Sequence, residues 1–360
     1  MIPLFKVRMA AAASEIVGRT LHSGVVTQGP RVEEFEEALR TVLGASVLTV
    51  NSGTSAITLA LHLSGVGPGD EVVVTPMTCT ATVCPIVTRG ARPVWADIDP
   101  LTGLIDPADV ARKTTELTRA VVAVDFGGRP CDYAALKAAA PDIPLIVDAA
   151  HSFGATYHGE PIARCPDADY VCWSFQAIKH LTTGDGGAIR VPSGQVERAK
   201  RLRWFGLDRV PFAGLVGARE AGYKFHMNDI AASIGLANLP EAMRSVEDHR
   251  RNAAAYAMLL ASCHRVVLPP PSAESSWWLY PILVDDREAF IAHMAARGVE
   301  CNPVHGRADA HASFQFPAGP LPGVDYYATR EVAIPVGWWL GPQEIAFVAE
   351  AVARFDGRGW

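Results

Sequence analysis

An acid follows directly after a run of apolar residues in the segment 145–151, which reads Leu-Ile-Val-Asp-Ala-Ala-His. The apolar run predicts a strand buried on both faces of a sheet, and ligands of open α/β sheets bind at the carboxyl ends of such strands. A carboxylate buried there is costly unless a cationic group meets it. Asp148 is therefore a candidate partner for a positively charged part of a ligand. The alternative is that Asp148 caps the helix that follows.

A lysine lies in a second segment, 173–187, which reads Trp-Ser-Phe-Gln-Ala-Ile-Lys-His-Leu-Thr-Thr-Gly-Asp-Gly-Gly. A strand is predicted to end near Phe175, and Lys179 follows in a stretch without charged neighbours, before glycines that let the backbone approach a ligand closely. Apolar surroundings lower the pKa of a lysine and make its amine nucleophilic, which Schiff-base chemistry requires. The alternative is that Lys179 is an ordinary solvated surface group.

Small residues open a helix in a third segment, Asn-Ser-Gly-Thr-Ser-Ala at 51–56, directly before a helical apolar run. The first turn of a helix has free N–H groups and the positive end of the helix dipole, an arrangement that binds phosphate. Gly53, Thr54 and Ser55 are the candidates for that contact. Ordinary capping of the helix explains such a string as well.

One ligand would use all three segments. Pyridoxal 5′-phosphate (PLP) has an aldehyde, a basic ring nitrogen and a phosphate, and proteins meet the first two with a lysine Schiff base and an aspartate at the pyridinium. We therefore predict a PLP enzyme. In it, Lys179 would hold the aldehyde, Asp148 the ring nitrogen, and the helix start near Gly53 the phosphate.

The elements that must position these residues follow from the apolar runs, glycines and prolines between residues 45 and 190. Short apolar runs that suit strands alternate there with helical segments. Strands are predicted at 47–50, 71–74, 94–96, 120–124, 145–147, 170–175 and 188–191, and helices at 57–63 and 133–140. This alternation is typical of a three-layer αβα domain with a mostly parallel central sheet.

The rest of the chain predicts a smaller domain. A helix at 229–239 is expected to stop at Pro240, and a second helix is expected to run from 241 to 261. A proline run then indicates a hinge-like connection. It is followed by a predicted strand at 278–284 and predicted helices at 287–297 and 342–355. We predict a large PLP-binding domain at 1–240 and a small C-terminal α+β domain at 241–360.

The composition limits the classes of function. Of 360 residues, 49% are hydrophobic and 19% charged, and the formal net charge of −6 provides no field that would hold nucleic acid or an anionic membrane. The seven cysteines have no zinc-type spacing and are odd in number, so we expect no metal site, no disulfide framework and a reducing, cytoplasmic compartment. No stretch is long and apolar enough for a signal peptide or a membrane span. Small-molecule partners are therefore expected.

Five short motifs, in their order along the chain, resemble the DegT/DnrJ/EryC1/StrS aminotransferases. They are Ser-Gly-Thr-Ser at 52–55, Asp-Ala-Ala-His at 148–151, Ser-Phe-x-x-x-Lys at 174–179, Gly-Asp-Gly-Gly at 184–187 and Met-Asn-Asp-Ile-x-Ala at 227–232. The likeness extends over nearly the whole chain. It implies a fold-type I PLP enzyme that aminates a nucleotide-linked keto sugar.

The resemblance also implies a role for each matching residue. Lys179 would form the Schiff base, Asp148 would pair with the ring nitrogen, and His151 would lie near the ring face and its phenolic oxygen. The phosphate contacts that match the family are Thr54, Ser55 and Ser174, joined by Asn228 from the other subunit. A homodimer with shared active sites is thus implied by the resemblance alone.

Two positions depart from the family pattern. Cys79 occupies a place where relatives often have an aromatic residue that stacks on the pyridoxal ring, so another group, such as His151, has to provide that face. His180 follows the lysine where many relatives have asparagine, which leaves the substrate side of the pocket open to question.

The implied reaction is a ping-pong transamination in which glutamate gives its amino group to a nucleotide-linked keto-deoxysugar. One alternative is a PLP-dependent elimination or cyclisation of an amino-acid substrate in secondary metabolism. Another is a non-catalytic regulator on the same fold, since a fold alone assigns no function. Relatives that act as sugar dehydratases have histidine in place of the lysine, so Lys179 argues against that reaction.

Three further groups of residues have less specific interpretations. The polar segment 302–311, which includes Arg307, would either face the acceptor or form a solvated loop. The basic run 200–203 is expected on the exposed face of a helix. The tryptophan pairs 277–278 and 338–339 are expected to pack in the core or between the domains.

Overall fold

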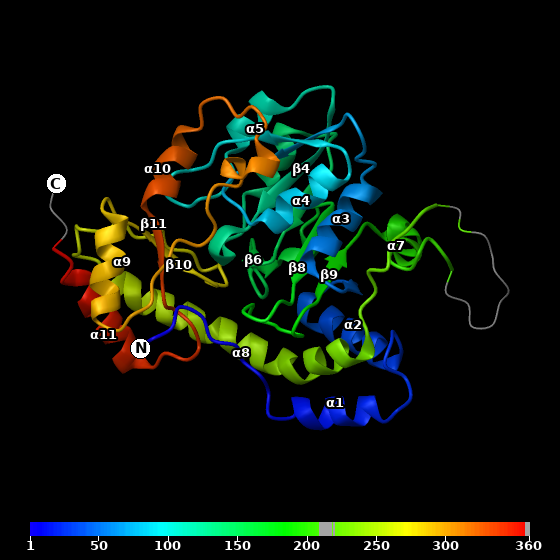
Figure 1. The fold of residues 1–360 in the computed structure, drawn as a ribbon, viewed down its shortest axis with the longest axis horizontal. Coiled ribbons are helices and arrows are strands. Elements are labelled where there is room, and N and C mark those ends of the chain that lie inside the picture. The colour runs from blue at the N-terminus through cyan, green and yellow to red at the C-terminus, as the bar shows by residue number, and fades with distance from the viewer. Residues whose placement is uncertain (209–217, 219, 357–360) are drawn as a thin grey trace.

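Seven strands form the central sheet of the computed structural model, which describes residues 1–208, 218 and 220–356 (Figure 1). Their order across the sheet is β1-β9-β8-β5-β4-β2-β3. Neighbouring strands of this described sheet are parallel except at β9, which is antiparallel to both β1 and β8. The strands are β1 (Leu48–Val50), β2 (Glu71–Val74), β3 (Arg92–Trp95), β4 (Thr118–Val124), β5 (Leu145–Asp148), β8 (Tyr170–Ser174) and β9 (Gly187–Arg190). The prediction of a mostly parallel sheet is confirmed.

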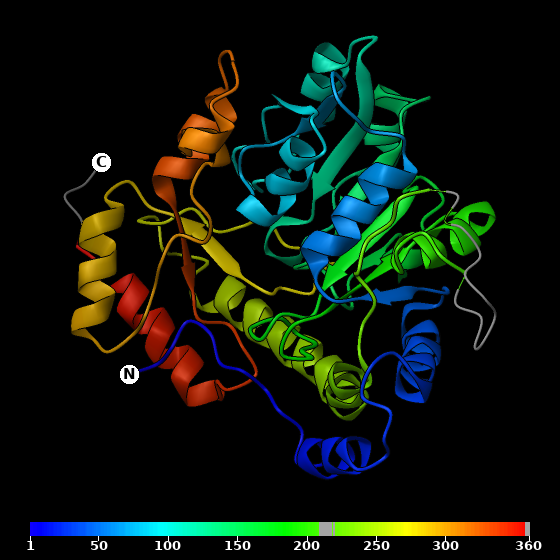
Figure 2. The same ribbon diagram turned by 45° about the vertical axis from the view of Figure 1, so that its right-hand side comes forward.

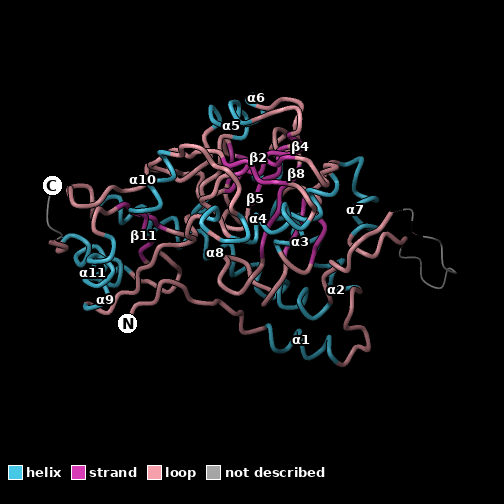
Figure 3. Tube along the Cα trace, turned by 45° about the horizontal axis from the view of Figure 1, so that its top comes forward, coloured by secondary structure: helices cyan, strands magenta, loops and turns pink. Residues whose placement is uncertain are grey.

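Helices cover both faces of the sheet (Figure 3). Successive residues of a strand point to opposite faces of the sheet. Val72 and Val74 pack in one apolar cluster with α3 and α4, whereas Val73 packs in another with α2 and α6. Because both faces are covered, the strands are apolar at successive positions. The helices of these layers are α2 (Pro30–Leu43), α3 (Gly53–Leu63), α4 (Thr80–Thr88), α5 (Pro107–Lys113), α6 (Tyr133–Ala139) and α7 (Val196–Leu202). The predicted αβα layering is confirmed.

A continuous helix, α8 (Asp229–Leu259), replaces the two helices predicted on either side of Pro240, so that prediction was wrong. Proline lacks the N–H that bonds to the preceding turn, which costs about 3 kcal/mol in a helix interior. Contacts on both sides of Pro240 offset this loss. The side chain of Asn238 donates to the carbonyl of Thr182 at 2.8 Å, and Glu241 pairs with Arg8. A local sequence pattern does not reveal partners that are so distant in the sequence.

The predicted division of the chain at residue 240 stays a prediction, and α8 runs through that position. Despite its 31 residues, α8 is not apolar enough to cross a bilayer, and neither is any other described helix.

A smaller group of elements follows α8 and has its own apolar cluster (Figure 2). Its strands form an antiparallel pair that is covered by the last turns of α8 and by two further helices. Its elements are β10 (Tyr280–Leu283), α9 (Arg287–Ala296), α10 (Pro322–Arg330), β11 (Glu331–Ile334) and α11 (Pro342–Ala353). A short antiparallel pair, β6 (Thr156–Tyr157) and β7 (Glu160–Pro161), belongs to the larger part.

The N-terminal segment lies against this smaller part before the chain reaches α1 (Ala13–Leu21), which packs along α8 (Figures 1 and 2). The N–H of Ile2 donates to the carbonyl of Gly298 at 2.7 Å, and the carbonyl of Ile2 accepts the N–H of Glu300 at 2.9 Å. The indole N–H of Trp339 donates to the carbonyl of Pro3 at 3.1 Å. These bonds hold the residues that follow, Leu4 and Phe5, beside the cavity described below.

The basic run 200–203 only partly matches its predicted exposed helix face. The helix α7 ends at Leu202, which is buried. Arg203 turns inward, where its guanidinium donates to Glu36 at 2.6 Å and to the carbonyl of Thr49 at 2.8 Å. The prediction was wrong at these two positions because Arg203 finds a carboxylate on α2, an element that precedes the sheet.

Candidate active site

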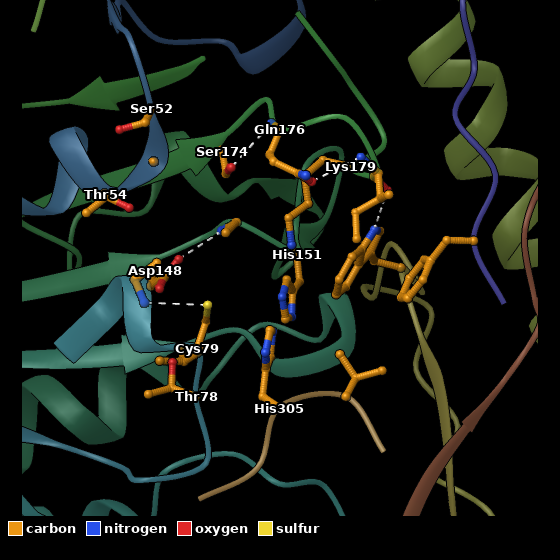
Figure 4. Close-up of a pocket in the computed structure, with 18 of the residues that line it drawn as sticks. Ser52, Thr54, Thr78, Cys79, Asp148, His151, Ser174, Gln176, Lys179 and His305 are labelled. Carbon is orange, nitrogen blue, oxygen red and sulfur yellow. Dashed lines mark hydrogen bonds between the residues drawn. The ribbon is translucent and has the colours of Figure 1, made fainter. Parts of the chain in front are cut away.

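A cavity of about 540 Å³ opens at the edge of the sheet where β1, β2, β5 and β8 end (Figure 4). Open α/β sheets bind their ligands at this edge. Six of the eight predicted site residues line the cavity: Gly53, Thr54, Asp148, His151, Ser174 and Lys179. Ser55 and Asn228 do not line it. The fold thus brings together three segments that are far apart in the sequence.

Lys179 extends into the cavity from the loop that follows β8 (Figure 4). Its backbone N–H donates to the carbonyl of Gln176 at 2.9 Å, in the turn that places the side chain. Burial lowers the pKa of Lys179 from 10.5 to about 7, although the negative charge of Asp148 opposes this shift. At pH 7 roughly half of the amine is therefore neutral and nucleophilic.

Asp148 ends β5 and is buried at the floor of the cavity. Its carboxylate accepts the hydroxyl of Thr82 at 2.7 Å and the N–H of Ala150 at 3.1 Å. Burial raises the pKa of Asp148, whereas these two bonds and the charge of Lys179 lower it. The residues after Asp148 form turns rather than a helix, so helix capping does not explain this acid. A cation placed beside it would favour its charged form.

His151 is held between two other rings. Its ring centre lies 4.0 Å from that of Trp278 at an interplanar angle of 29°, and 5.5 Å from that of His305 at 11°. The backbone N–H of Gly127 donates to Nδ1 of His151 at 3.3 Å, so the neutral ring has its proton on Nε2. Burial lowers the pKa of His151 well below 6.5, and the charge of Lys179 lowers it further. His151 is therefore a neutral hydrogen-bond donor at pH 7.

A second buried acid, Asp125, supports the loop that carries His151. One carboxylate oxygen of Asp125 accepts the hydroxyls of Ser152 at 2.6 Å and Tyr133 at 2.7 Å. Burial raises the pKa of Asp125 to about 7, against the effect of these hydrogen bonds. Ser152 follows His151 directly, and Gly127 lies two residues after Asp125. This one carboxyl group therefore anchors both segments that orient the imidazole.

The start of α3 forms another wall of the cavity. Ser52 caps the helix by accepting the N–H of Ser55 at 3.1 Å, which leaves the first-turn N–H groups of Gly53 and Thr54 for a ligand. A Cβ at Gly53 would lie 2.8 Å from Cβ of Ser174, so only glycine lets the helix begin this close to β8. Amides, a helix dipole and the hydroxyls of Thr54 and Ser174 together suit an anion such as phosphate.

The two predicted phosphate contacts outside the cavity have other partners in this chain. The buried hydroxyl of Ser55 donates to the side-chain oxygen of Asn51 at 2.6 Å. Asn228 is exposed and caps α8, accepting the N–H of Ala231 at 2.8 Å. A contact of Asn228 with a cofactor phosphate would therefore require a second subunit.

Sequence reasoning gave Trp278 a packing role only, yet its ring lines the cavity beside Lys179. His305, from the polar segment 302–311, lines the cavity as well, and burial lowers its pKa to about 4. No local pattern distinguishes either residue, because both reach the site from the smaller C-terminal part of the chain.

Two residues whose place the sequence left open do not line the cavity. His180 lies behind Lys179, where its Nε2 donates to the carbonyl of Ser276 at 3.2 Å. Arg307 forms ion pairs with Asp309 and Asp325. In this structure neither His180 nor Arg307 therefore contacts the cavity in which the acceptor was expected.

The donor set of the cavity fits PLP. An amine with a lowered pKa suits an aldehyde, a buried acid with a raised pKa suits a pyridinium nitrogen, and a glycine-bounded helix start suits a phosphate. Lys179, Asp148 and the first turn of α3 would hold these three groups. On a seven-stranded αβα sheet, this combination defines the class of fold-type I PLP enzymes.

Comparison with known proteins gives the family. The family model of the DegT/DnrJ/EryC1/StrS aminotransferases matches residues 8–353, and the chain belongs to that family. The sugar aminotransferase CalS13 from Micromonospora echinospora is 36% identical, with a TM-score of 0.94 that covers 98% of this chain and 99% of that chain. AtS13 from Actinomadura melliaura is 39% identical, with a TM-score of 0.93 and coverage of 100% and 99%.

Spr1654 from Streptococcus pneumoniae in its PLP form is 26% identical, with a TM-score of 0.90 and coverage of 98% of this chain and 97% of that chain. The chain is thus a member of a family of PLP-dependent sugar aminotransferases, and its cofactor is PLP. The resemblance drawn from the five sequence motifs is confirmed.

The close approach of α3 to β8 can be tested with Gly53→Ala. The added methyl group overlaps Ser174, so we expect a loss of about 1–3 kcal/mol in the free energy of unfolding and weaker PLP binding. Thermal unfolding and a PLP titration measure the two effects. Gly18→Ala is the matched control, because a Cβ there meets no atom within 4 Å. Equal behaviour of both variants would contradict the close contact.

The lowered pKa of Lys179 predicts how imine formation depends on pH. Only the neutral amine attacks an aldehyde, so the rate at which apoprotein combines with PLP should rise about tenfold per pH unit below 7 and level off above it. Stopped-flow absorbance measures this rate, and N-acetyl-lysine serves as the exposed reference. A rate that keeps rising up to pH 10, as for the reference amine, would contradict the burial effect.

Proposed function

We propose that this protein transfers the amino group of glutamate to a nucleotide-linked keto-deoxysugar by a ping-pong mechanism. The observation that carries the proposal is that the Lys179 amine, whose pKa is lowered by its surroundings, lines the same cavity as the buried carboxylate of Asp148. The likeness to the sugar aminotransferase CalS13 supports a sugar as the acceptor. Glutamate and the nucleotide are taken from the family resemblance.

The residues have separate tasks in this reaction. When bound, PLP supplies an aldehyde that joins amines as a Schiff base and a ring that accepts electrons. Asp148 keeps a proton on the ring nitrogen, because opposite charges a few ångströms apart favour both charged forms. Lys179 acts twice: its amine first holds the aldehyde and, once the donor amine has replaced it, takes the proton from the α-carbon of the donor.

Two further groups bind rather than react. His151 offers the Nε2 proton, which the bond from Gly127 to Nδ1 fixes in place, to an oxygen in the cavity. The first turn of α3, with Thr54 and Ser174, holds the phosphate. These contacts keep the reacting carbon beside Lys179 Nζ while one substrate leaves and the next one enters.

Both substrates have to use one cavity in turn. The reacting amine and the ring acid lie in the same cavity, so the donor must release its keto acid before the acceptor binds. Glu300 and Asn302, from the smaller part of the chain, also line it and supply hydrogen-bond groups suited to sugar hydroxyls. This arrangement favours a ping-pong order.

The first half-reaction tests the donor. Glutamate added to the holoenzyme should remove the imine absorption band and release one 2-oxoglutarate per active site, because the amino group stays on the enzyme. A panel of keto-sugar nucleotides, assayed by mass spectrometry, then identifies the acceptor. A spectrum that glutamate leaves unchanged would contradict the proposed donor, and an eliminated or cyclised amino acid as product would contradict transamination.

Replacement of the lysine tests the site assignment. Lys179→Ala should abolish the imine band and lower turnover by at least about 100-fold, since the variant loses both the attachment point and the general base. Lys200→Ala is the control, because Lys200 lies on α7, outside the cavity, and pairs with the exposed Glu197. Full turnover of Lys179→Ala would overturn the assignment.

We infer a homodimer in which Asn228 reaches the phosphate of the partner subunit. The segment that leads into α2 packs against the start of α8, where the N–H of Asp229 donates to the carbonyl of Thr27 at 2.9 Å. Asn228 therefore lies near Val25 and Val26, two apolar side chains that are more than one-third exposed. Exposed apolar side chains beside a polar site residue are typical of an interface.

Mixed dimers test this shared site. We expect Lys179→Ala and Asn228→Ala to be weakly active as separate proteins, and activity to return when the two are unfolded together and refolded. The hybrid has one site with both Lys179 and Asn228 intact. Activity per hybrid dimer should reach about half of that of the wild type, as the ratio of intact sites requires. No recovery in hybrids that size-exclusion chromatography shows to be dimeric would contradict a shared site.

The compartment we propose is the cytoplasm. All seven cysteines lie in the described part of the chain and are free thiols. A reducing environment keeps such thiols free, whereas an oxidising one would pair or modify the exposed ones.

A further inference from the structure

The side chain of Trp278 contacts both Lys179 and His151, which packing in the core alone does not require. Its side chain is almost fully buried, and its ring nevertheless lines the cavity. Nζ of Lys179 lies 3.6 Å from the centre of the Trp278 ring, which places the amine on the aromatic face. The ring of His151 stacks against the same tryptophan at 4.0 Å.

The indole is itself fixed from three sides. Its Nε1 donates to the carbonyl of Ile178 at 3.0 Å, the residue directly before the lysine. The ring of Phe5, from the N-terminal segment, stacks on it at 5.2 Å and 26°. The neighbouring backbone N–H of Leu279 donates to the carbonyl of Gly127, whose own N–H donates to His151. The aromatic face therefore has one fixed position relative to the lysine loop.

A fixed aromatic face matters because a lysine side chain is flexible. Four methylene groups give the amine many rotamers, and within the described part of the chain no hydrogen bond fixes the Lys179 amine in one of them. An aromatic ring attracts an ammonium group through its quadrupole, most strongly for tryptophan and in a desolvated site. The ring therefore favours one position of the amine and stabilises the amine once it has gained a proton.

We propose that the face of Trp278 is the resting place of the Lys179 amine whenever this amine is not bonded to the cofactor, and that Trp278 is thereby a positioning residue for proton transfer. The role in turnover rests on the proposed transamination. In that reaction Nζ would take the proton from the α-carbon of the donor and become an ammonium ion. The electron pair of the broken C–H bond would stay on carbon, where PLP would stabilise it as an electron sink, and Nζ would then pass its proton to the former aldehyde carbon of the cofactor and become neutral again. The indole holds Nζ through this charged stage.

Trp277 provides a matched control beside it in the sequence. Trp277 belongs to the apolar cluster of the smaller part, and its Nε1 donates to the carbonyl of Ser272 at 3.1 Å. The guanidinium of Arg129, not a lysine, lies over its ring. Trp277→Phe therefore changes a tryptophan of the same region while it leaves the surroundings of Lys179 intact.

The position of the amine can be observed in the apoprotein. Protons above an aromatic ring resonate upfield, so in a spectrum of protein labelled at lysine ¹³Cε, Lys179 should give an upfield-shifted ε-CH₂ signal, assigned by its loss in Lys179→Ala. We expect this shift to persist in Trp277→Phe, to shrink in Trp278→Phe and to vanish in Trp278→Leu. An unshifted Lys179 signal in the wild-type apoprotein would overturn the proposal.

The role in proton transfer has its own readout in the holoenzyme. With glutamate deuterated at the α-carbon, we expect the rate of the half-reaction in Trp278→Leu to fall by about 2- to 30-fold, the range of an aromatic–ammonium contact. The deuterium isotope effect should rise because proton transfer becomes limiting. Trp278→Phe should lie between this variant and the wild type. An unchanged isotope effect with a slower rate would mean a purely structural role and overturn the positioning claim.

The two measurements separate this inference from the proposed function. A wild-type holoenzyme that does not react with glutamate, together with an upfield Lys179 signal in the apoprotein, would refute the donor and leave the resting place standing. A normal half-reaction with glutamate together with an unshifted Lys179 signal would support the donor and refute the resting place.

Discussion

At the carboxyl edge of the sheet, the amine of Lys179 is largely withdrawn from solvent. Lys179 lines a cavity whose surroundings favour the neutral form of its amine, and the opposing charge of Asp148 reverses only part of that effect. A neutral amine near pH 7 can attack an aldehyde, whereas an ordinary lysine with a pKa of about 10.4 is almost fully charged there. The same burial keeps His151 neutral and raises the pKa of Asp148, so the acid gains from the arrival of a cationic ring nitrogen. Low solvation at one sheet edge thus prepares three groups for the same cofactor.

The fold achieves this because its strands end together. Asp148 ends β5, Lys179 follows β8, and the capped start of α3 follows β1, so residues from three distant segments meet at one edge of the sheet. The smaller C-terminal part and the N-terminal segment then close the other side with Trp278, His305 and Phe5. A buried network behind the cavity completes the arrangement. Asp125 anchors Ser152, and the turn that begins at Asp125 brings Gly127 to the imidazole. Positions that look unrelated in the chain are thereby held as one rigid site.

Local patterns in the sequence were sufficient for the sheet and for the polar residues that end its strands. The strand at 71–74 was predicted to the residue, because a strand covered on both faces contains a continuous apolar run, here the three valines that follow Glu71. Lys179 and Asp148 could be singled out for the same reason, as charged groups at the ends of apolar runs. The continuous helix through Pro240, the inward turn of Arg203 and the aromatic wall at Trp278 could not be foreseen. Each of them depends on a partner that only folding brings near. The helix is held by Thr182 and Arg8, Arg203 pairs with Glu36, and Trp278 lies against Lys179.

Chemical trapping with a reducing agent can show whether Lys179 forms the covalent bond to PLP. Holoenzyme treated with borohydride, which reduces an imine to a stable amine, should yield after digestion a single phosphopyridoxyl-modified peptide, with the label at Lys179. Fragmentation mass spectrometry locates the modified residue. We expect a label at Lys179 alone. A label at another lysine, or PLP that dialyses away after reduction and leaves an unmodified protein, would contradict this expectation.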